Sequence, residues 1–392
     1  MNGQAFWNGA LSFSVAEGAR RGKVLGVFVP MLDLSSLSLP LLLVLFAGAA
    51  GAVWLAGIKL SNATDILSAR FGLGEALGGL ILLAIVTNLP EIAITLSGAL
   101  SHQLDLAVGN ILGGIGVQTV VLVALDVWGV GKSAPLTYRA AALNLVLEGV
   151  LVLAVLSVCV MGFELPANFV VGRLEPAGIG IAALWVGGLW LINKARTGLP
   201  WHENGQAPDN QNKPSGSSKP KGGKAARSQS GAGNRTLWVF GIGAAVTLVA
   251  GVVLQTSGEG IAKHFGMSGV LFGATFLAAS TSLPELSTGL AAVKKGDYQL
   301  AISDIFGGNA FLPVLFLMAS LVSGQAVLPS AHKSDIYLTG LGMLLTGVYI
   351  TGLIFRPKRQ IARMGIDSLC VLIFYVLGIG GLVALARSSH GN

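Results

Sequence analysis

The strongest constraint on the fold is a duplicated segment that places a proline and a glutamate inside an apolar stretch. Residues 69–114 align without a gap with residues 263–308, so that Glu91 of the first copy recurs as Glu285 of the second, 194 positions later. The two copies share a Leu-Pro-Glu triplet, a Phe-Gly pair near the start and a Gly-Gly pair at the end. Such self-similarity at a fixed offset indicates one structural unit used twice.

Composition places both copies in a membrane. Only 11% of the residues are charged and 53% are hydrophobic, with a mean hydropathy of +0.73. A soluble chain carries roughly 25% charged residues, and far fewer cannot cover the water-exposed surface of a protein of this size. The net charge of +7 therefore concerns the two faces of a bilayer, and we expect no nucleic-acid partner.

Segments of about 20 apolar residues, the length that crosses the hydrocarbon core, recur along the chain. They predict an all-α, polytopic membrane protein with about ten transmembrane helices. The predicted spans are 38–60, 74–100, 104–127, 138–162, 169–193, 236–257, 267–293, 298–323, 335–355 and 367–387.

One segment of different composition divides the spans into two sets of five. Residues 201–235 are mostly polar residues, glycine, proline and lysine, which cannot bury enough apolar surface to fold, so we expect a flexible linker. The predicted units are an extramembrane leader at 1–35, a first five-helix repeat at 36–200, this linker, and a second five-helix repeat at 236–388.

The number of spans between the two motifs sets their relative orientation. They lie on the second and seventh spans, and an odd separation of five places them in opposite directions across the bilayer. This is an inverted-topology repeat, in which transporters hold their substrate near the midplane. Most of the 25 Lys and Arg residues fall in loops on the side of the linker, which predicts a cell (inner) membrane protein whose linker is cytoplasmic.

The proline in each motif breaks its helix and frees oxygen atoms. Proline has no N–H, so Pro90 and Pro284 leave the carbonyl groups four residues earlier without their helical partner. At membrane depth such backbone is tolerated where it lines a cavity. The side chains beside the break add further oxygens: Thr87 and Asn88 in the first copy, Thr281 and Ser282 in the second.

Glu91 and Glu285 supply the charge. Each lies well inside its span, where a carboxylate is costly unless it is protonated or paired, and no Lys or Arg lies in either motif core. A bound proton or a bound cation is the remaining partner. Calcium takes six to eight oxygen ligands, and two inverted copies provide about that many.

These motifs resemble those of the calcium/cation antiporter superfamily, which includes sodium/calcium exchangers and cation/proton exchangers with paired α-repeats. The residues that carry the resemblance are TNLPE at 87–91 with GNILGG at 109–114, and TSLPE at 281–285 with SDIFGGN at 303–309. The resemblance implies exchange of calcium for sodium or protons by alternating access. It also implies that Glu91 and Glu285 are the central ligands and that Thr87 and Thr281 contribute backbone carbonyls.

The chain departs from the sodium-coupled pattern of that superfamily. Gly114 and Gly308 stand where those members usually have a small hydroxyl residue, and Gln118 and Leu312 stand where they have Asn or Asp. Gln118 offers one oxygen and Leu312 offers none. Asp304, which matches Asn110 of the first copy, begins the eighth span, so we expect it at the mouth of the site.

Two carboxylates are neutralised by one calcium or by two protons, whereas sodium needs ligands that are missing here. This favours proton coupling, while the TSLPE half is typical of sodium-coupled members, so both counter-ions stay open.

Glu148, deep in the fourth span, is either a proton relay or a buried residue bonded to Asn144. Asp105 and Asp126 flank the third span, which predicts interfacial positions.

The predicted function is a secondary-active antiporter for calcium or a related cation, with small inorganic cations and the lipid bilayer as partners, no resident cofactor and an open oligomeric state. The alternatives are a passive cation channel or uniporter on the same scaffold, and a non-transporting receptor with a degenerate site, which Leu312 favours. An enzyme is not expected, since the sequence contains no H-E-x-x-H, G-x-S-x-G or G-x-x-x-x-G-K-[ST] motif.

Overall fold

A computed structural model describes residues 37–71, 85–131, 134–140, 142–166, 173–197 and 232–389, which are almost entirely helical. The predicted leader at 1–35 and nearly all of the predicted linker at 201–235 lie outside these residues. In chain order the elements are α2 (Leu39–Phe71), α4 (Leu89–Leu100), α5 (Leu104–Leu125), the π-helical turn η2 (Asp126–Val130), α6 (Leu136–Ala140), α7 (Leu143–Phe163), α8 (Pro176–Thr197), α9 (Ala232–His264), α10 (Gly269–Phe272), the π-helical turn η4 (Gly273–Leu277), α11 (Ala278–Thr281), α12 (Leu283–Lys294), α13 (Tyr298–Phe311), α14 (Val314–Ser323), the 3-10 turn η5 (Leu328–Ser330), α15 (Lys333–Phe355), the antiparallel strands β1 (Gln360–Ile361) and β2 (Met364–Gly365), and α16 (Ile366–Ser389).

The described residues contain eight helical segments that are long and apolar enough to cross a membrane. They are α2, α5 with η2, α7, α8, α9, α13 with α14, α15 and α16. Two shorter apolar helices, Leu89–Leu100 and Gly269–Thr281, stand where the second and seventh spans were expected at 74–100 and 267–293. The described residues thus confirm eight of the ten expected spans, and the two expected spans that carry the motifs are represented by these shorter helices.

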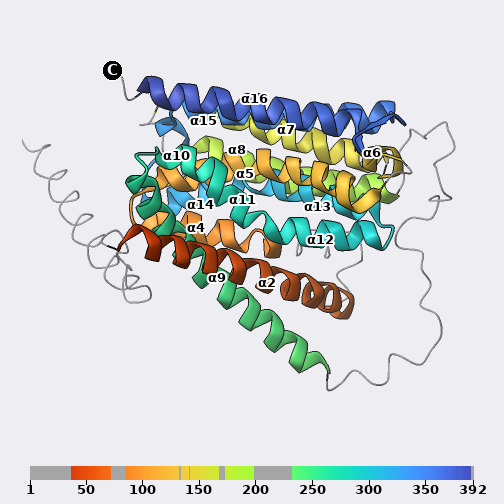
Figure 1. The fold of residues 1–392 in the computed structure, drawn as a ribbon, viewed down its shortest axis with the longest axis horizontal. Coiled ribbons are helices and arrows are strands. Elements are labelled where there is room, and N and C mark those ends of the chain that lie inside the picture. Colours follow the sequence, from red (N-terminus) through yellow and green to blue (C-terminus); the bar gives the residue numbers. More distant parts are fainter. Residues whose placement is uncertain are drawn as a thin grey trace, which may run out of the picture.

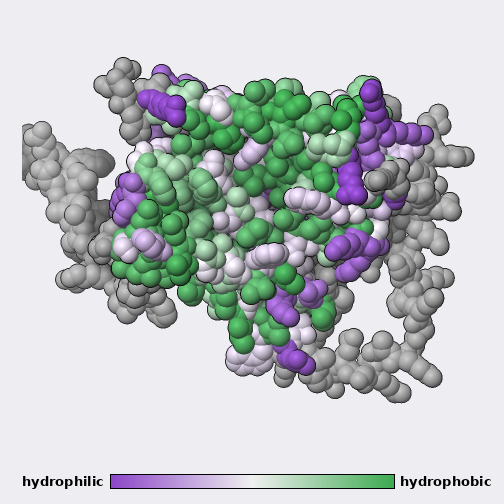
Figure 2. Space-filling view, viewed as in Figure 1, coloured by the Kyte–Doolittle hydropathy of each residue, from purple (hydrophilic) through white to green (hydrophobic). Residues whose placement is uncertain are grey.

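A broad apolar band lies on the face of the bundle drawn in Figure 2, between hydrophilic side chains that gather toward the two ends of the helices. Large apolar side chains are well exposed on the surface of the protein, among them Leu55, Val186, Trp190 and Trp238. Exposed apolar side chains in this arrangement face lipid, because a water-soluble surface does not carry apolar patches of this extent.

The two repeats exchange contacts in a symmetric way. In Figure 1, α2 and α9 lie side by side along one edge of the bundle, and each packs against the motif helix of the other repeat, α2 against α12 and α9 against α4. The contact points are equivalent glycines: a Cβ at Gly57 would lie 2.7 Å from Pro284, and a Cβ at Gly251 would lie 3.0 Å from the carbonyl oxygen of Pro90. The inverted repeat is therefore visible as reciprocal packing on the two motif prolines.

The helical backbone of both motifs is interrupted immediately before Leu-Pro-Glu, as the sequence predicts. Asn88 and Ser282 have nearly the same backbone angles, φ −89°, ψ 15° and φ −82°, ψ 3°, which lie outside the regular helical values. Pro90 and Pro284 then fall within the first two positions of α4 and α12. A proline is tolerated there because the first helical N–H groups have no partner within the helix.

α5 and α13 form the centre of the bundle and contact one another. Of the most apolar window of α5, 89% of the residues are buried. Its glycines bring the backbone of the other repeat very close, since a Cβ at Gly109 or Gly113 would collide with Val270 or Ala274. The broken helix of the second repeat is thus held against α5 by backbone contact.

Candidate cation-binding site

Glu91 and Glu285 meet in the centre of the bundle. Each is in the first turn of the helix that follows its break, and their exposed fractions are 0% and 1%. Among the described residues, none of their four carboxylate oxygens has a hydrogen-bond partner. The two groups lie within electrostatic range of one another, and the second negative charge that acts on Glu285 comes from Asp304.

This arrangement cannot stay ionised without a positive guest. Removing a carboxylate from water without a partner costs several kcal/mol, and a second like charge nearby adds to that cost. The groups whose charge acts on Glu285 are themselves acids. A proton or a metal cation is therefore the partner that the pair requires.

The four residues beside the breaks lie inside the protein. Thr87, Asn88, Thr281 and Ser282 are all buried, with exposed fractions of 2% or less. The hydroxyl group of Thr281 lies beside the carboxylate of Glu91 and donates to the carbonyl oxygen of Ala278. Ser282 donates to the same carbonyl at 2.7 Å, which leaves its lone pairs available. The motif of one repeat therefore reaches the acid of the other.

α5 and α13 line the site between the two motifs. Gln118 Nε2 donates to Asn88 Oδ1 at 3.4 Å, while Gln118 Oε1 has no partner. Thr281 also donates to Asn110 Oδ1 at 3.4 Å. In the second repeat, Asp304 Oδ2 accepts a hydrogen bond from Thr288, one turn after Glu285.

The glycine pairs let these helices approach. A Cβ at Gly308 would lie 3.1 Å from Gln118 Oε1 and 3.2 Å from Asn88 Nδ2, whereas a Cβ at the equivalent Gly114 would lie 3.4 Å from Leu312 Cδ1. Gln118 and Leu312 are equivalent positions, so each glycine faces the same position of the opposite repeat. The first repeat contributes an amide there and the second a methyl group.

One expectation from the sequence is corrected. Asp304 does not lie at an exposed mouth of the site, because the residue is only 5% exposed and its charge acts on Glu285. Asp126 lies at the end of α5, as expected, but its side chain is packed inside the protein, with an exposed fraction of 0%. The segments that cover these two residues, α12 for Asp304 and the β hairpin for Asp126, are tertiary features that the sequence did not predict.

Asn309 was not recognised from the sequence. It is fully buried, its Nδ2 donates to Thr119 Oγ1 at 3.2 Å, and its Oδ1 has no partner. Its position directly after the Gly307-Gly308 pair was the available signal, but the repeat comparison concealed it because the equivalent residue is Ile115. Asn110, noticed only as the counterpart of Asp304, also belongs to this polar centre.

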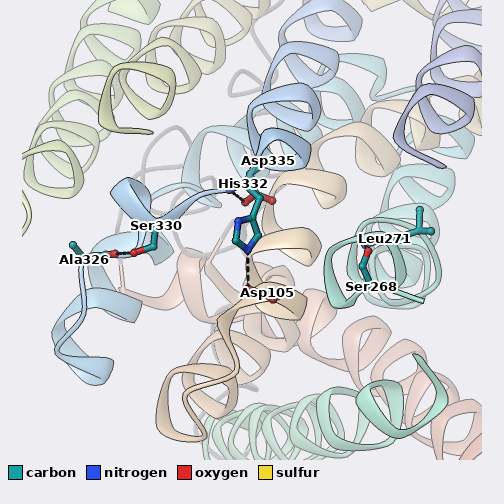
Figure 3. Close-up of polar contacts among 7 residues, drawn as sticks. All are labelled: Asp105, Ser268, Leu271, Ala326, Ser330, His332 and Asp335. Carbon is teal, nitrogen blue, oxygen red and sulfur yellow. Dashed lines mark hydrogen bonds and ion pairs between the residues drawn. The ribbon is translucent and has the colours of Figure 1, made fainter. Parts of the chain in front are cut away.

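Two further acids, Asp105 and Glu148, were considered from the sequence. Asp105, at the start of α5, is interfacial as expected: Figure 3 shows His332, before α15, pointing toward it, at 3.9 Å with both side chains largely exposed. So exposed a pair contributes little stability. Glu148 is buried in α7, and its role stays a prediction.

The chemistry of the centre suits a hard cation held by mixed oxygen donors. Within the described part of the chain, no three Asp, Glu, His or Cys side chains come close enough to hold an ion by themselves. The two glutamates would need amide, hydroxyl and carbonyl oxygens to complete a shell, which is the usual composition of calcium sites. The residues at the breaks and on α5 provide those oxygens.

Comparisons with known proteins agree with this arrangement. The family model described as sodium/calcium exchanger protein matches residues 40–192 and 235–383. The inner membrane protein YrbG of Escherichia coli (strain K12) is 28% identical over 306 residues, 78% of this chain and 86% of YrbG. The putative antiporter CaxA of Alkalimonas amylolytica is 27% identical over 327 residues, 83% of this chain and 93% of CaxA.

A solved structure shares the fold. The crystal structure of the H⁺/Ca²⁺ exchanger CAX aligns with a TM-score of 0.60 over 88% of this chain and 87% of that protein, at 10% sequence identity. At so low an identity the likeness concerns the arrangement of helices alone.

Gly308 faces the polar side chains of Gln118 and Asn88, whereas Gly114 faces Leu312, and this difference leads to a prediction. We expect Gly308→Ala to weaken calcium binding roughly tenfold, about 1.4 kcal/mol, because the added methyl group displaces Gln118 and Asn88. Gly114→Ala, its matched control, meets only a leucine methyl group and should change affinity less than about twofold. Isothermal titration of purified protein measures both, and equal losses in the two variants would show that the glycines act through helix packing alone.

Proposed function

Because the chain belongs to the sodium/calcium exchanger protein family, we propose that it is a secondary-active antiporter that exchanges calcium, or a related cation, for protons or sodium by alternating access. Family membership confirms the resemblance seen in the sequence motifs. The observation that carries the proposal is the pair Glu91 and Glu285, buried, mutually repelling and without hydrogen-bond partners.

Obligatory exchange follows from the cost of leaving the pair empty. Two adjacent ionised carboxylates at membrane depth are too costly to persist, so the site changes sides only with a guest that neutralises them. Calcium and the counter-ion then compete for the same oxygens, and the two-repeat frame supplies equivalent inward and outward arrangements. A passive channel would need a continuous polar pore instead.

Protons are the counter-ion that the site chemistry favours. One calcium or two protons neutralise the two glutamates, whereas sodium ions need additional oxygens. At the equivalent positions on α5 and α13, Gln118 offers one oxygen and Leu312, 0% exposed and packed toward Gly114, offers none. Sodium remains the competing counter-ion.

The location proposed is the cell (inner) membrane with the 201–235 linker in the cytoplasm. The charge distribution of the loops supports this side. In Figure 1, α6 and the start of α9 lie at the same end of the bundle.

Transport in lipid vesicles tests the proposal. We expect calcium uptake driven by an imposed proton gradient, with a smaller or absent response to a sodium gradient. Glu91→Gln and Glu285→Gln should each lower the uptake roughly 100-fold, since each removes a central charged ligand worth about 3 kcal/mol. Glu164→Gln, which removes an exposed carboxylate at the end of α7, is the matched control and should retain full uptake.

The outcomes separate the alternatives. Uptake that follows membrane potential alone, without any ion gradient, identifies a channel or uniporter. Calcium binding without flux in the wild-type protein identifies a non-transporting receptor.

A substitution at Leu312 tests the choice of counter-ion. Leu312→Asn places an amide oxygen opposite Gly114 and should raise sodium-driven calcium uptake roughly tenfold relative to the wild type. Gln118→Leu, the reciprocal variant, removes the oxygen of the other repeat and should lower sodium-driven uptake further. If neither variant changes the ratio of sodium-driven to proton-driven uptake, these two positions do not determine the counter-ion.

A further inference from the structure

A second pair of buried acids lies away from the glutamates. Asp126, where α5 passes into η2, and Asp367, in the first turn of α16, have exposed fractions of 0% and 5%. Asp126 is eight residues beyond Gln118 on the same helical segment, or about 12 Å along the axis. The pair lies near α6 and the β1–β2 hairpin, at one end of the bundle in Figure 1.

Asp126 accepts hydrogen bonds from three donors. Its Oδ1 accepts from the backbone N–H of Leu136 at 2.8 Å. Its Oδ2 accepts from the N–H of Gly365 at 2.6 Å and from the hydroxyl of Ser368 at 2.8 Å. Three donors directed at one carboxylate favour its charged form. Asp126 thereby joins α5, the start of α6 and the hairpin.

Asp367 differs from Asp126 in its hydrogen bonding. Among the described residues, neither of its carboxylate oxygens has a partner in good hydrogen-bond geometry, and neither has the hydroxyl of Thr137, which lies beside it and is 1% exposed. Glycines flank the carboxylate, because a Cβ at Gly352 or Gly365 would collide with it. The packing thus leaves room for the acid, with the Thr137 hydroxyl beside it.

Within the described part of the chain, the pair also lacks a counter-charge. Asp367 lies within electrostatic range of Asp126, and neither carboxylate takes part in an ion pair with another described residue. A proton or a metal ion can neutralise the second charge, and a metal ion needs only oxygen atoms that face one space.

We propose that Asp126, Thr137 and Asp367 form a second cation-binding site, separate from the exchange site, that takes one small hard cation such as calcium. Two carboxylates and a hydroxyl are the donors such ions prefer, and water completes the shell. An ion there links the start of α6 to the start of α16 and holds the hairpin between them against the end of α5.

Calcium binding to a full-length protein without its exchange site tests this proposal. In the double variant Glu91→Gln/Glu285→Gln, isothermal titration with calcium chloride should still show about one ion per chain, and calcium should still raise the melting temperature. Adding Asp367→Asn should abolish both effects. Adding Glu164→Gln instead, which removes an exposed carboxylate, should leave both unchanged.

A milder variant keeps the test valid if Asp367→Asn does not fold. Thr137→Val removes only the hydroxyl oxygen, and in the same double-variant background it should weaken calcium binding roughly tenfold. A folded double variant that binds neither calcium nor sodium overturns the proposal. Residual binding that is unaffected by both Asp367→Asn and Thr137→Val overturns it as well.

Discussion

Mutual repulsion between two buried carboxylates is the constraint around which the rest of this structure is arranged. Glu91 and Glu285 are buried and have no hydrogen-bond partner among the described residues. Such a placement is among the most unfavourable for an acid. The broken helices, the glycine contacts of α5 and α13, and the crossed packing of α2 and α9 all serve to bring them together. Their need for a positive guest is what makes the fold an exchanger.

The two repeats share their backbone arrangement but differ in the side chains at the site. Gly57 and Gly251 pack on Pro284 and Pro90 in equivalent ways, which shows how closely the backbone follows the duplication. Side chains at equivalent positions differ: the polar Gln118 corresponds to the apolar Leu312, and the neutral Asn110 corresponds to the acidic Asp304. In the proposed mechanism, the symmetric frame allows alternating access, and the departures from symmetry determine ion selectivity.

Sequence alone predicted the parts of the site that depend on local chemistry. A proline cannot continue a helix, so the pauses at Asn88 and Ser282 and the acids that follow them were predictable, as was the inverted repeat. The depth of Asp304, the burial of Asp126 and the role of Asn309 were not, because each depends on a segment remote in sequence that covers or contacts the residue. The seventh span was expected to be interrupted at its proline, but the π-helical turn η4 before it has no equally local signal.

The most direct measurement of the central claim is the number of protons released when calcium binds. Purified protein in weakly buffered, sodium-free detergent solution is titrated with calcium while a pH indicator follows the release. Charge balance at Glu91 and Glu285 predicts that each saturated chain releases about two more protons than a saturated chain of the double glutamine variant. Calcium binding with equal proton release in the two proteins would contradict a neutralised glutamate pair as the basis of exchange.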